Sequence, residues 1–193
     1  MTEAMREGVN ESQEQARLRA LQALNLIGTA PEERFDRITR MAREIFGVPV
    51  AAVNLVDDKE LFIKSPTVPG ARTMARADTF CDVTISSPDL LVVEDAAADP
   101  RFAAKPDVAG GRGVRFYAGR PLTINGEHRV GTLCLFDNKT RELNDEDRKM
   151  LDELGAWAEK ELYDSMDIDR AHDIQQALLP PRGNEPAGTR GGG

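Results

Sequence analysis

The chain has 193 residues, of which 40% are hydrophobic and 30% are charged, and its formal net charge is -8. This size supports one folded domain with extensions, and the acidic balance disfavours nucleic acid, whose phosphates are also negative. No apolar run approaches the ~20 residues that span a bilayer, and the polar residues 1–15 lack the apolar core of a signal peptide, so we expect a cytoplasmic protein without a membrane partner.

The first segment is predicted to contain a leader and one helix. Residues 1–11 are polar and are interpreted as a disordered leader, whereas residues 12–27 favour an N-terminal helix that Gly28 ends. Apolar side chains recur every three residues in this helix and form one stripe. The members of the stripe are Leu18, Leu21 and Leu24.

A second helix is predicted to follow directly. Thr29 and Glu32 have the spacing of a capping box, in which two side chains bond the free backbone amides at a helix start. Gly47 is suited to the left-handed residue that follows a helix end. The apolar face between these signals consists of Phe35, Ile38, Ala42 and Ile45.

Strand patterns occupy the middle of the chain. Residues 48–57 are rich in valine and end at two aspartates, which indicates a buried strand and a turn, and residues 60–65 pair back as a second strand. Residues 90–95 form a third strand. Prolines and glycines make the segment before it largely loop, although residues 77–87 include a helical spacing. In the long connection after it, Asp99 is placed to cap a short helix that has proline in its first position.

The last strands are predicted to form a hairpin. Asn125 and Gly126 separate two alternating runs, and both residue types tolerate the positive φ that a two-residue turn requires. The second run has mostly apolar residues on both faces, which suits a central strand covered on both sides. One of these faces is formed by Val130, Thr132, Cys134 and Phe136.

A long helix is predicted at the C-terminal side. Asn144 and three acidic residues begin it, because acids are favourable at the positive end of a helix. Its apolar pattern continues past the usual length of a globular helix, so the helix should leave the domain, and residues 182–193 are interpreted as a disordered tail. The apolar stripe consists of Leu151, Leu154, Ala158, Leu162 and Met166.

Five blocks of the sequence, taken in order, resemble a bacterial GAF domain. They read "APEERFDRITRMAREIFGVPVAAVNLVDD", "FC-x-x-TI", "VVEDAAADPRF", "VRFYAGRPL" and "GTLCLFD". The resemblance covers residues 29–162, and we assign residues 28–163 to the domain. It implies an α+β fold with an antiparallel sheet of five or six strands, terminal helices packed on one face and a possible ligand pocket on the other. Most members serve as sensory or dimerisation modules that feed an output domain.

A second, shorter resemblance concerns "AHDIQQALLPP", residues 171–181. This stretch looks like the segment that opens SpoIIE-type serine/threonine phosphatase domains, and residues 164–181 would then be an exit helix and linker. The dozen residues after it are too few for the metal-binding aspartate motifs of that phosphatase, so we expect no phosphatase activity from this chain. The other interpretation is an amphipathic helix that two prolines end.

The resemblance also places candidate ligand contacts near strand ends and covering segments. Small-molecule pockets are mostly apolar and contain a few polar groups. The candidates in this sequence are Phe62, Phe80, Cys81, Phe102, Arg115 and Tyr117. The competing interpretation is that the aromatic residues fill the core and leave no cavity.

The two cysteines are too few for a disulfide scaffold, and both are expected to be thiols in a reducing compartment. Cys134 is flanked by leucines, and neither His128 nor His172 is placed to activate it, so we interpret it as a small core residue. Cys81 borders the expected pocket. It is either a buried structural thiol or a redox-sensing one.

The enzymatic and cofactor-binding variants of the family do not match the sequence. Free methionine sulfoxide reductases use cysteines around an extended loop, whereas the corresponding residues 95–107 contain none. The Cys-His pair of bilin attachment and the Asn-Lys-Phe motif of cyclic-nucleotide binding are not visible, and the two histidines are poorly placed for haem. Acidic residues do not cluster at metal-ligand spacing. We expect no catalytic residue, no metal site and no cofactor.

The leading hypothesis is a homodimeric sensory module of bacterial signal transduction. The two terminal apolar stripes would pack side by side and against those of a second subunit. A change in helix packing would then carry the signal to an output such as a SpoIIE-type phosphatase. Two alternatives stay open: a thiol-based redox sensor or small redox enzyme using Cys81, and a ligand-free dimerisation scaffold.

Overall fold

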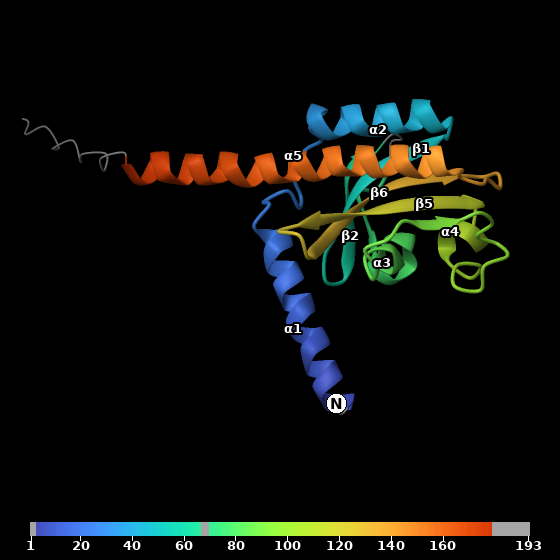
Figure 1. Cartoon of the computed structure of the whole chain (residues 1–193), viewed down its shortest axis with the longest axis horizontal. Helices are drawn as coiled ribbons and strands as arrows, with labels where there is room; N and C mark the ends of the chain where they lie inside the picture. The colour runs from blue at the N-terminus through green and yellow to red at the C-terminus, as the bar shows by residue number, and fades with distance from the viewer. Residues whose placement is uncertain (1–2, 67–69, 179–193) are drawn as a thin grey trace, which may run out of the picture.

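A six-stranded antiparallel sheet forms the centre of the molecule, in a computed structural model that describes residues 3–66 and 70–178 (Figure 1). The strand order is β3-β2-β1-β6-β5-β4. This arrangement confirms the predicted α+β class and antiparallel sheet. The strands are β1 (Val50–Val56), β2 (Glu60–Pro66), β3 (Thr73–Ala75), β4 (Leu91–Val93), β5 (Phe116–Ile124) and β6 (His128–Asp137).

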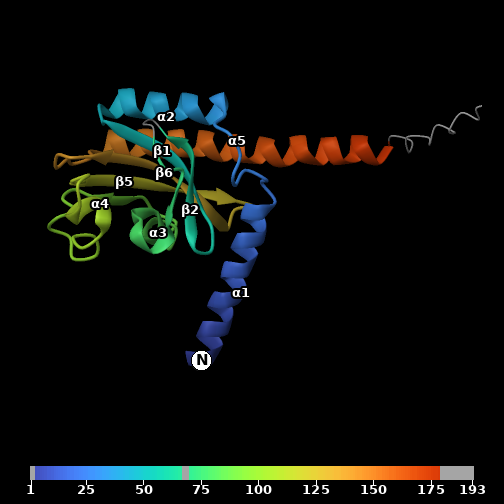
Figure 2. The ribbon, with the colours of Figure 1, turned by 180° about the vertical axis from the view of Figure 1, so that it is seen from behind.

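Helices cover both faces of the sheet. Helices α2 (Glu33–Phe46) and α5 (Asp145–Leu178) lie side by side over one face, whereas α3 (Phe80–Thr84) and α4 (Pro106–Ala109) lie on the other (Figures 1 and 2). Helix α1 (Glu3–Gln22) runs away from the sheet, and α5 extends beyond it. No helix in the described ranges combines the length and apolarity needed to cross a bilayer.

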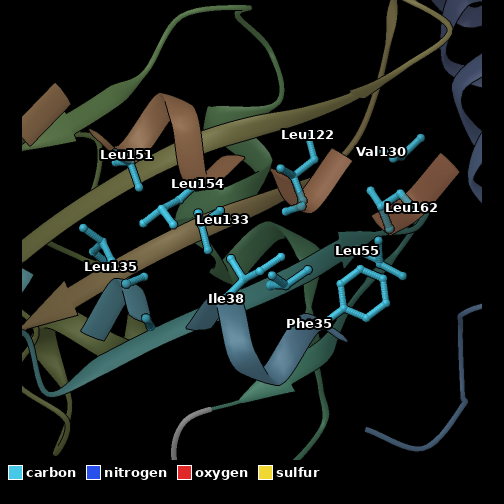
Figure 3. Packing of buried hydrophobic residues seen from close by; sticks show 14 of the residues in the cluster. Phe35, Ile38, Leu55, Leu122, Val130, Leu133, Leu135, Leu151, Leu154 and Leu162 are labelled. Carbon is cyan, nitrogen blue, oxygen red and sulfur yellow. The ribbon is translucent and has the colours of Figure 1, made fainter. Parts of the chain in front are cut away.

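The larger hydrophobic core fills the space between the sheet and the layer of α2 and α5. Figure 3 shows Ile38 of α2 and Leu154 of α5 near Leu133 of the central strand β6. Side chains of β1 alternate between the two faces, because successive residues of a strand point in opposite directions. The larger core therefore receives Ala51, Val53 and Leu55.

The N-terminal helix differs from the prediction at both ends. It begins at Glu3 and ends at Gln22, so it includes most of the segment 1–11 that was expected to be disordered. Polar residues extend the helix because helix propensity does not depend on apolarity. At the other end, Asn25 has a left-handed φ of 51° and Gly28 a φ of 76°. The left-handed backbone at Asn25 ends the helix before the predicted stop.

The predicted capping box is wrong. Glu32 precedes α2, but its side chain makes no cap hydrogen bond. Lys64 of β2 instead donates to Thr29 Oγ1 and to Glu32 Oε1, each at 2.5 Å. Both side chains are therefore hydrogen-bonded to Lys64. Gly47 has a φ of 58° directly after α2, which confirms the predicted end of the helix.

Most of the predicted dimer contacts are buried within one chain. The larger core contains six of them, and Leu18 and Met166 pack against it. Helix α1 packs on β6, whereas α5 packs on α2 and β5, and the two terminal helices diverge in both views (Figures 1 and 2). Their apolar stripes therefore cover the domain's own core. The six core residues are Leu21, Leu24, Leu151, Leu154, Ala158 and Leu162.

The predicted hairpin is confirmed. Asn125 and Gly126 have φ angles of 54° and 75°, and they join β5 to β6. Val130 was expected on the same face as the alternate residues after it, but it belongs to the larger core. The cause is a register shift between Leu122 and Thr123, which changes the alternation at this end of the hairpin.

The long connections contain more structure than the sequence indicates. The segment expected to be loop after β2 includes β3 and a 3₁₀ turn, Arg76–Asp78. Between β4 and β5, Asp99 accepts from the amide of Arg101 at 2.9 Å within a turn, and the short helix α4 begins later, at Pro106. Pairing with a neighbouring strand is a long-range effect, so local spacing did not reveal β3.

Candidate functional site

A cavity of about 430 Å³ opens on the sheet face opposite α2 and α5. Alternate side chains of β1 and β2 contribute to it, together with residues of β3, α3, α4 and the end of β6 and of the segments before β3 and after α4. This volume lies in the range that is usual for small-molecule sites, and the lining is mostly apolar. The principal lining residues are Val50, Ala52, Asn54, Leu61, Ile63, Met74, Phe80, Cys81, Val114 and Phe136.

Asn54 supplies a buried amide to this lining. Its Nδ2 lies 3.4 Å from the Sγ atoms of both Cys81 and Cys134. Its Oδ1 is buried and has no hydrogen-bond partner among the described residues. An unpaired buried polar atom costs on the order of 1–3 kcal/mol.

Two thiols meet beneath the cavity. Cys81 of α3 and Cys134 of β6 have their Sγ atoms 3.4 Å apart, and both residues are buried. Thr132 Oγ1 lies 3.2 Å from the Cys81 sulfur and 2.9 Å from the Cys134 sulfur. The Tyr117 hydroxyl lies 3.3 Å from Cys134 and bonds Thr84 Oγ1 at 2.7 Å. The sequence did not indicate that the two sulfurs lie close together, because the cysteines are 53 positions apart in the chain.

The surroundings shift the pKa values of the two thiols in opposite directions. Burial disfavours the Cys81 thiolate, but hydrogen bonds from Cys134, Thr132, Tyr117 and Asn54 outweigh it and lower the Cys81 pKa. Burial and the neighbouring Cys81 raise the Cys134 pKa well above its ordinary value. Burial also raises the pKa of Tyr117.

Stacked aromatic rings hold α3 against the sheet. Phe80 lies between Phe102, at 4.5 Å from centroid to centroid, and Tyr117, at 4.6 Å. Phe136 meets both Phe80 and Tyr117 edge to face. Both faces of the Phe80 ring are thus covered by protein, and the stack fixes the helix that carries Cys81.

Charged groups occur at the edge of the cavity. Arg112 Nη1 lies 3.2 Å from Asp107 Oδ1, and both residues belong to the lining. Asp137 also lines the cavity, but it is buried and paired with Arg141 at 2.6 Å. The edge therefore combines a solvent-exposed ion pair with a buried one.

The structure brings together some of the predicted contact residues and separates others. Phe80 and Cys81 line the cavity. Phe102 and Tyr117 lie behind them in the smaller core. Phe62 points to the opposite face and belongs to the larger core, because it alternates with Leu61 and Ile63 along β2. Arg115 is 43% exposed and pairs with Asp95 at 2.6 Å, away from the lining.

Asn54 was missed, although the sequence contained a signal for it. It is the one polar residue between Val50 and Val56, the bounds of the buried strand β1. A polar residue in such a run requires a partner or a function. The pattern alone did not say which face of the sheet would carry a cavity.

An ion-pair network connects α3 to α1. Asp82 of α3 accepts from Arg76 Nε at 2.6 Å, and Arg76 Nη1 donates to Glu14 of α1, also at 2.6 Å. Arg17 of α1 donates to the other Glu14 oxygen at 2.8 Å and to the carbonyl of Val56 at 2.5 Å. Helix α1 is thereby attached to the segment that covers the cavity.

Metal binding has no support in the described part of the chain. No group of three or more His, Cys, Asp or Glu side chains is placed there to hold one ion. The thiol pair offers two sulfur ligands only.

A model of the GAF domain family matches residues 30–162 of this chain. A cyclic di-GMP phosphodiesterase of Pseudomonas aeruginosa is 31% identical over 128 residues, which are 66% of this chain and 22% of that protein. The chain thus matches less than a quarter of the length of this curated relative.

Solved structures show the same fold. A free methionine-R-sulfoxide reductase from Neisseria meningitidis superposes with a TM-score of 0.56 at 19% identity, covering 82% of this chain and 89% of that one. The GAF domain of an Acinetobacter phosphoenolpyruvate-protein phosphotransferase gives 0.55 at 13% identity, covering 86% and 98%. Identities this low establish a common fold and nothing more.

Proposed function

The chain belongs to the GAF domain family, and on that premise we propose that it is a sensory module that binds a small molecule beside Asn54 and passes cavity occupancy to its terminal helices. The observation that carries the proposal is the Asn54 amide, which lines a 430 Å³ cavity and has an oxygen without a partner among the described residues. An unpaired buried amide oxygen in a mostly apolar wall can accept a hydrogen bond from a molecule in the cavity, and such a bond would remove the cost of burying it.

The lining indicates the chemistry of the ligand. Aliphatic and aromatic side chains form most of the wall, and the Asn54 amide is a buried lining group whose oxygen has no partner among the described residues. The ligand is therefore a metabolite-sized molecule with an apolar body and one polar group that meets Asn54. The Arg112–Asp107 pair at the edge is placed to contact a second, solvent-facing polar group.

The output is a separate part of the proposal. The Pseudomonas aeruginosa relative is named as a phosphodiesterase, and this chain matches only 22% of it. We propose by analogy that the module regulates an output domain, on the same polypeptide or another. The family match ends at residue 162, so it gives no support to the SpoIIE-type linker prediction at residues 171–181. Residues 179–181 and the tail at 182–193 lie outside the described residues.

A regulatory role is favoured over a reductase role. The loop that carries the cysteines of free methionine sulfoxide reductases corresponds here to residues 95–107, which contain no cysteine. Cys81 and Cys134 instead lie on α3 and β6, beneath the cavity. The ligand-free scaffold is the rival hypothesis, and the test below separates the two.

The test is native mass spectrometry of the protein purified from its own host, with Asn54→Leu as the variant. Leucine has a similar shape and removes the unpaired amide, so the ligand-free variant should be as stable as the ligand-free wild type, or more stable. We expect a retained small molecule on the wild type and its loss from the variant. A second variant, Ala52→Phe, should remove the ligand by filling the cavity.

Ala104→Phe is the matched control, because Ala104 is exposed and lies outside the lining. It should keep the retained mass. Two results together would overturn ligand sensing and support the scaffold hypothesis. The wild type would carry no molecule, and the Asn54→Leu variant would regulate its output as the wild type does.

A further inference from the structure

The spacing of Cys81 and Cys134 is suited to a reversible bond. Their sulfurs are 3.4 Å apart, and a disulfide requires about 2.05 Å, so the gap closes with a movement of little more than an ångström. Strand β6 is held by β1 on one side and by β5 on the other. Helix α3 is only five residues long and lies between a 3₁₀ turn and a loop. The movement would therefore fall on α3.

The two thiols differ in access from the cavity. Cys81 lines the cavity, whereas Cys134 lies behind it, so a small oxidant in the cavity meets Cys81 first. Thr132 lies within hydrogen-bond distance of both sulfurs, at 3.2 Å from Cys81 and 2.9 Å from Cys134, and can stabilise a thiolate on either. Thiolates are the reactive form toward peroxides. Because Cys81 is the thiol that lines the cavity, it is the attacking thiol and Cys134 is the resolving one.

We propose that Cys81 and Cys134 form a reversible intrachain disulfide when a hydroperoxide enters the cavity. The Cys81 sulfur attacks the peroxide oxygen, the O–O bond breaks, and Cys81 becomes a sulfenic acid while the alcohol or water leaves with a proton. The Cys134 sulfur then attacks the Cys81 sulfur, and the hydroxyl leaves as water with the Cys134 proton. Two thiols and one hydroperoxide give one disulfide, one alcohol or water, and one further water.

The disulfide would displace α3, which lines the cavity and is connected to α1 by ion pairs. Drawing Cys81 toward β6 moves Asp82, the next residue, which holds Arg76. Arg76 in turn holds Glu14 of α1. Oxidation and ligand binding would then act on the same helix from adjacent positions, although the thiol chemistry does not depend on any ligand.

The experiment treats the reduced full chain with equimolar hydrogen peroxide and records its intact mass. We expect the loss of two hydrogen masses, a peptide that links residues 81 and 134, and full recovery with dithiothreitol. In Cys134→Ser, dimedone should trap a sulfenic acid at Cys81. In Cys81→Ser, Cys134 should remain an unmodified thiol. Circular dichroism establishes that each variant is folded, and Cys→Ala versions replace any that is not.

Two threonines provide a matched test of the hydrogen bonds. Thr132→Val removes the hydroxyl nearest both sulfurs, and we expect oxidation to slow by about two- to tenfold. Thr39→Val removes a buried hydroxyl of α2 that bonds Ser65 outside the thiol network, so its rate should equal that of the wild type. The proposal is overturned if both thiols survive peroxide in the folded chain while the urea-unfolded chain is oxidised, or if the disulfide joins two chains.

Discussion

Arg76 and Glu14 form the direct connection between the segment that covers the cavity and the first helix. The Arg76 Nη1 atom lies 2.6 Å from Glu14 Oε1, and the same guanidinium holds Asp82 of α3 through its Nε atom. Residue 76 lies next to a short edge strand, and residue 14 lies on a helix that diverges from the sheet (Figure 1). A displacement of α3 therefore reaches α1 through a single side chain.

Replacing Arg76 should release α1 without unfolding the domain. Arg76→Gln removes ion pairs to both α1 and α3, so we expect faster amide hydrogen exchange in residues 11–22 and little change in α2. Arg101→Gln is the control, since its exposed ion pair with Asp99 involves neither α1 nor α3. Unchanged exchange in α1 would contradict the proposed connection.

The same ion pair predicts a loss of stability at low pH. Hydrogen bonds from Arg17 outweigh burial and, together with Arg76, lower the pKa of Glu14 from 4.5 to about 2. Because the folded pKa is below the unfolded one, this stabilisation is complete above pH 4.5 and is lost as the pH falls toward about 2. Urea unfolding across this range should show a shallower decline for Glu14→Gln than for the wild type. Glu11→Gln, on an exposed position of the same helix, should follow the wild-type curve.

Lys64 should contribute strongly to stability although it lies outside the site. Its side chain is 0% exposed, and its ammonium bonds Thr29, the carbonyl of Ala30 and Glu32. Lys64→Met removes the buried donor from Thr29 and from the Ala30 carbonyl, whereas Glu32 keeps its pair with Arg34, so we expect the unfolding free energy to fall by about 2–4 kcal/mol. Lys59→Met, at an exposed turn, should change it by less than about 0.5 kcal/mol. Equal effects of the two changes in urea unfolding would show that the buried contacts contribute nothing.

A glycine in β6 permits the close approach of β1. A Cβ atom added at Gly131 would lie 2.1 Å from the backbone oxygen of Asn54, which cannot move without breaking the strand pair. Gly131→Ala should therefore destabilise the protein by about 3 kcal/mol or more. Gly111→Ala, where no atom lies within 4 Å, should have little effect. A similar thermal midpoint for both variants would contradict the stated geometry.

The homodimer remains a prediction, and the structure indicates a different surface on which to test it. The core residues of the terminal helices are already covered, but Met41 and Ile45 of α2 are 37% and 48% exposed. If a second copy covers this face, Ile45→Asp should weaken dimerisation at least about tenfold in sedimentation experiments. Ile27→Asp, at an exposed apolar position outside the helices, is the control. A wild-type monomer at high concentration would refute the dimer.

Local signals were sufficient for much of the fold. The Asn125-Gly126 turn, the left-handed Gly47 and the valine-rich β1 each depend on neighbours in sequence, and each was predicted correctly. The capping box failed because Lys64 binds Thr29 and Glu32 from another element. Only the folded chain shows that competition.

The candidate site was harder to predict, because its parts come from distant segments. The spacing between Cys81 and Cys134 follows from the docking of α3 on the sheet, which the sequence does not encode locally. Phe62 was placed near the pocket through the resemblance, which does not say to which face of β2 a side chain points, and the structure places it in the larger core. Asn54 stood out as a polar residue in an apolar run. Knowing which face of the sheet carries the cavity would have been enough to identify it as a site residue.

Helix α5 has a mechanical consequence. It contains 34 residues, so it is about 50 Å long, and the residues after Met166 account for roughly 18 Å of that length. Its first half is fixed to the sheet, and its far end extends past the domain (Figure 2). A rotation of roughly 10° about the last core contact would displace residue 178 by about 3 Å. The helix can thus act as a lever arm that amplifies a small angular change into a displacement large enough to switch a neighbouring surface.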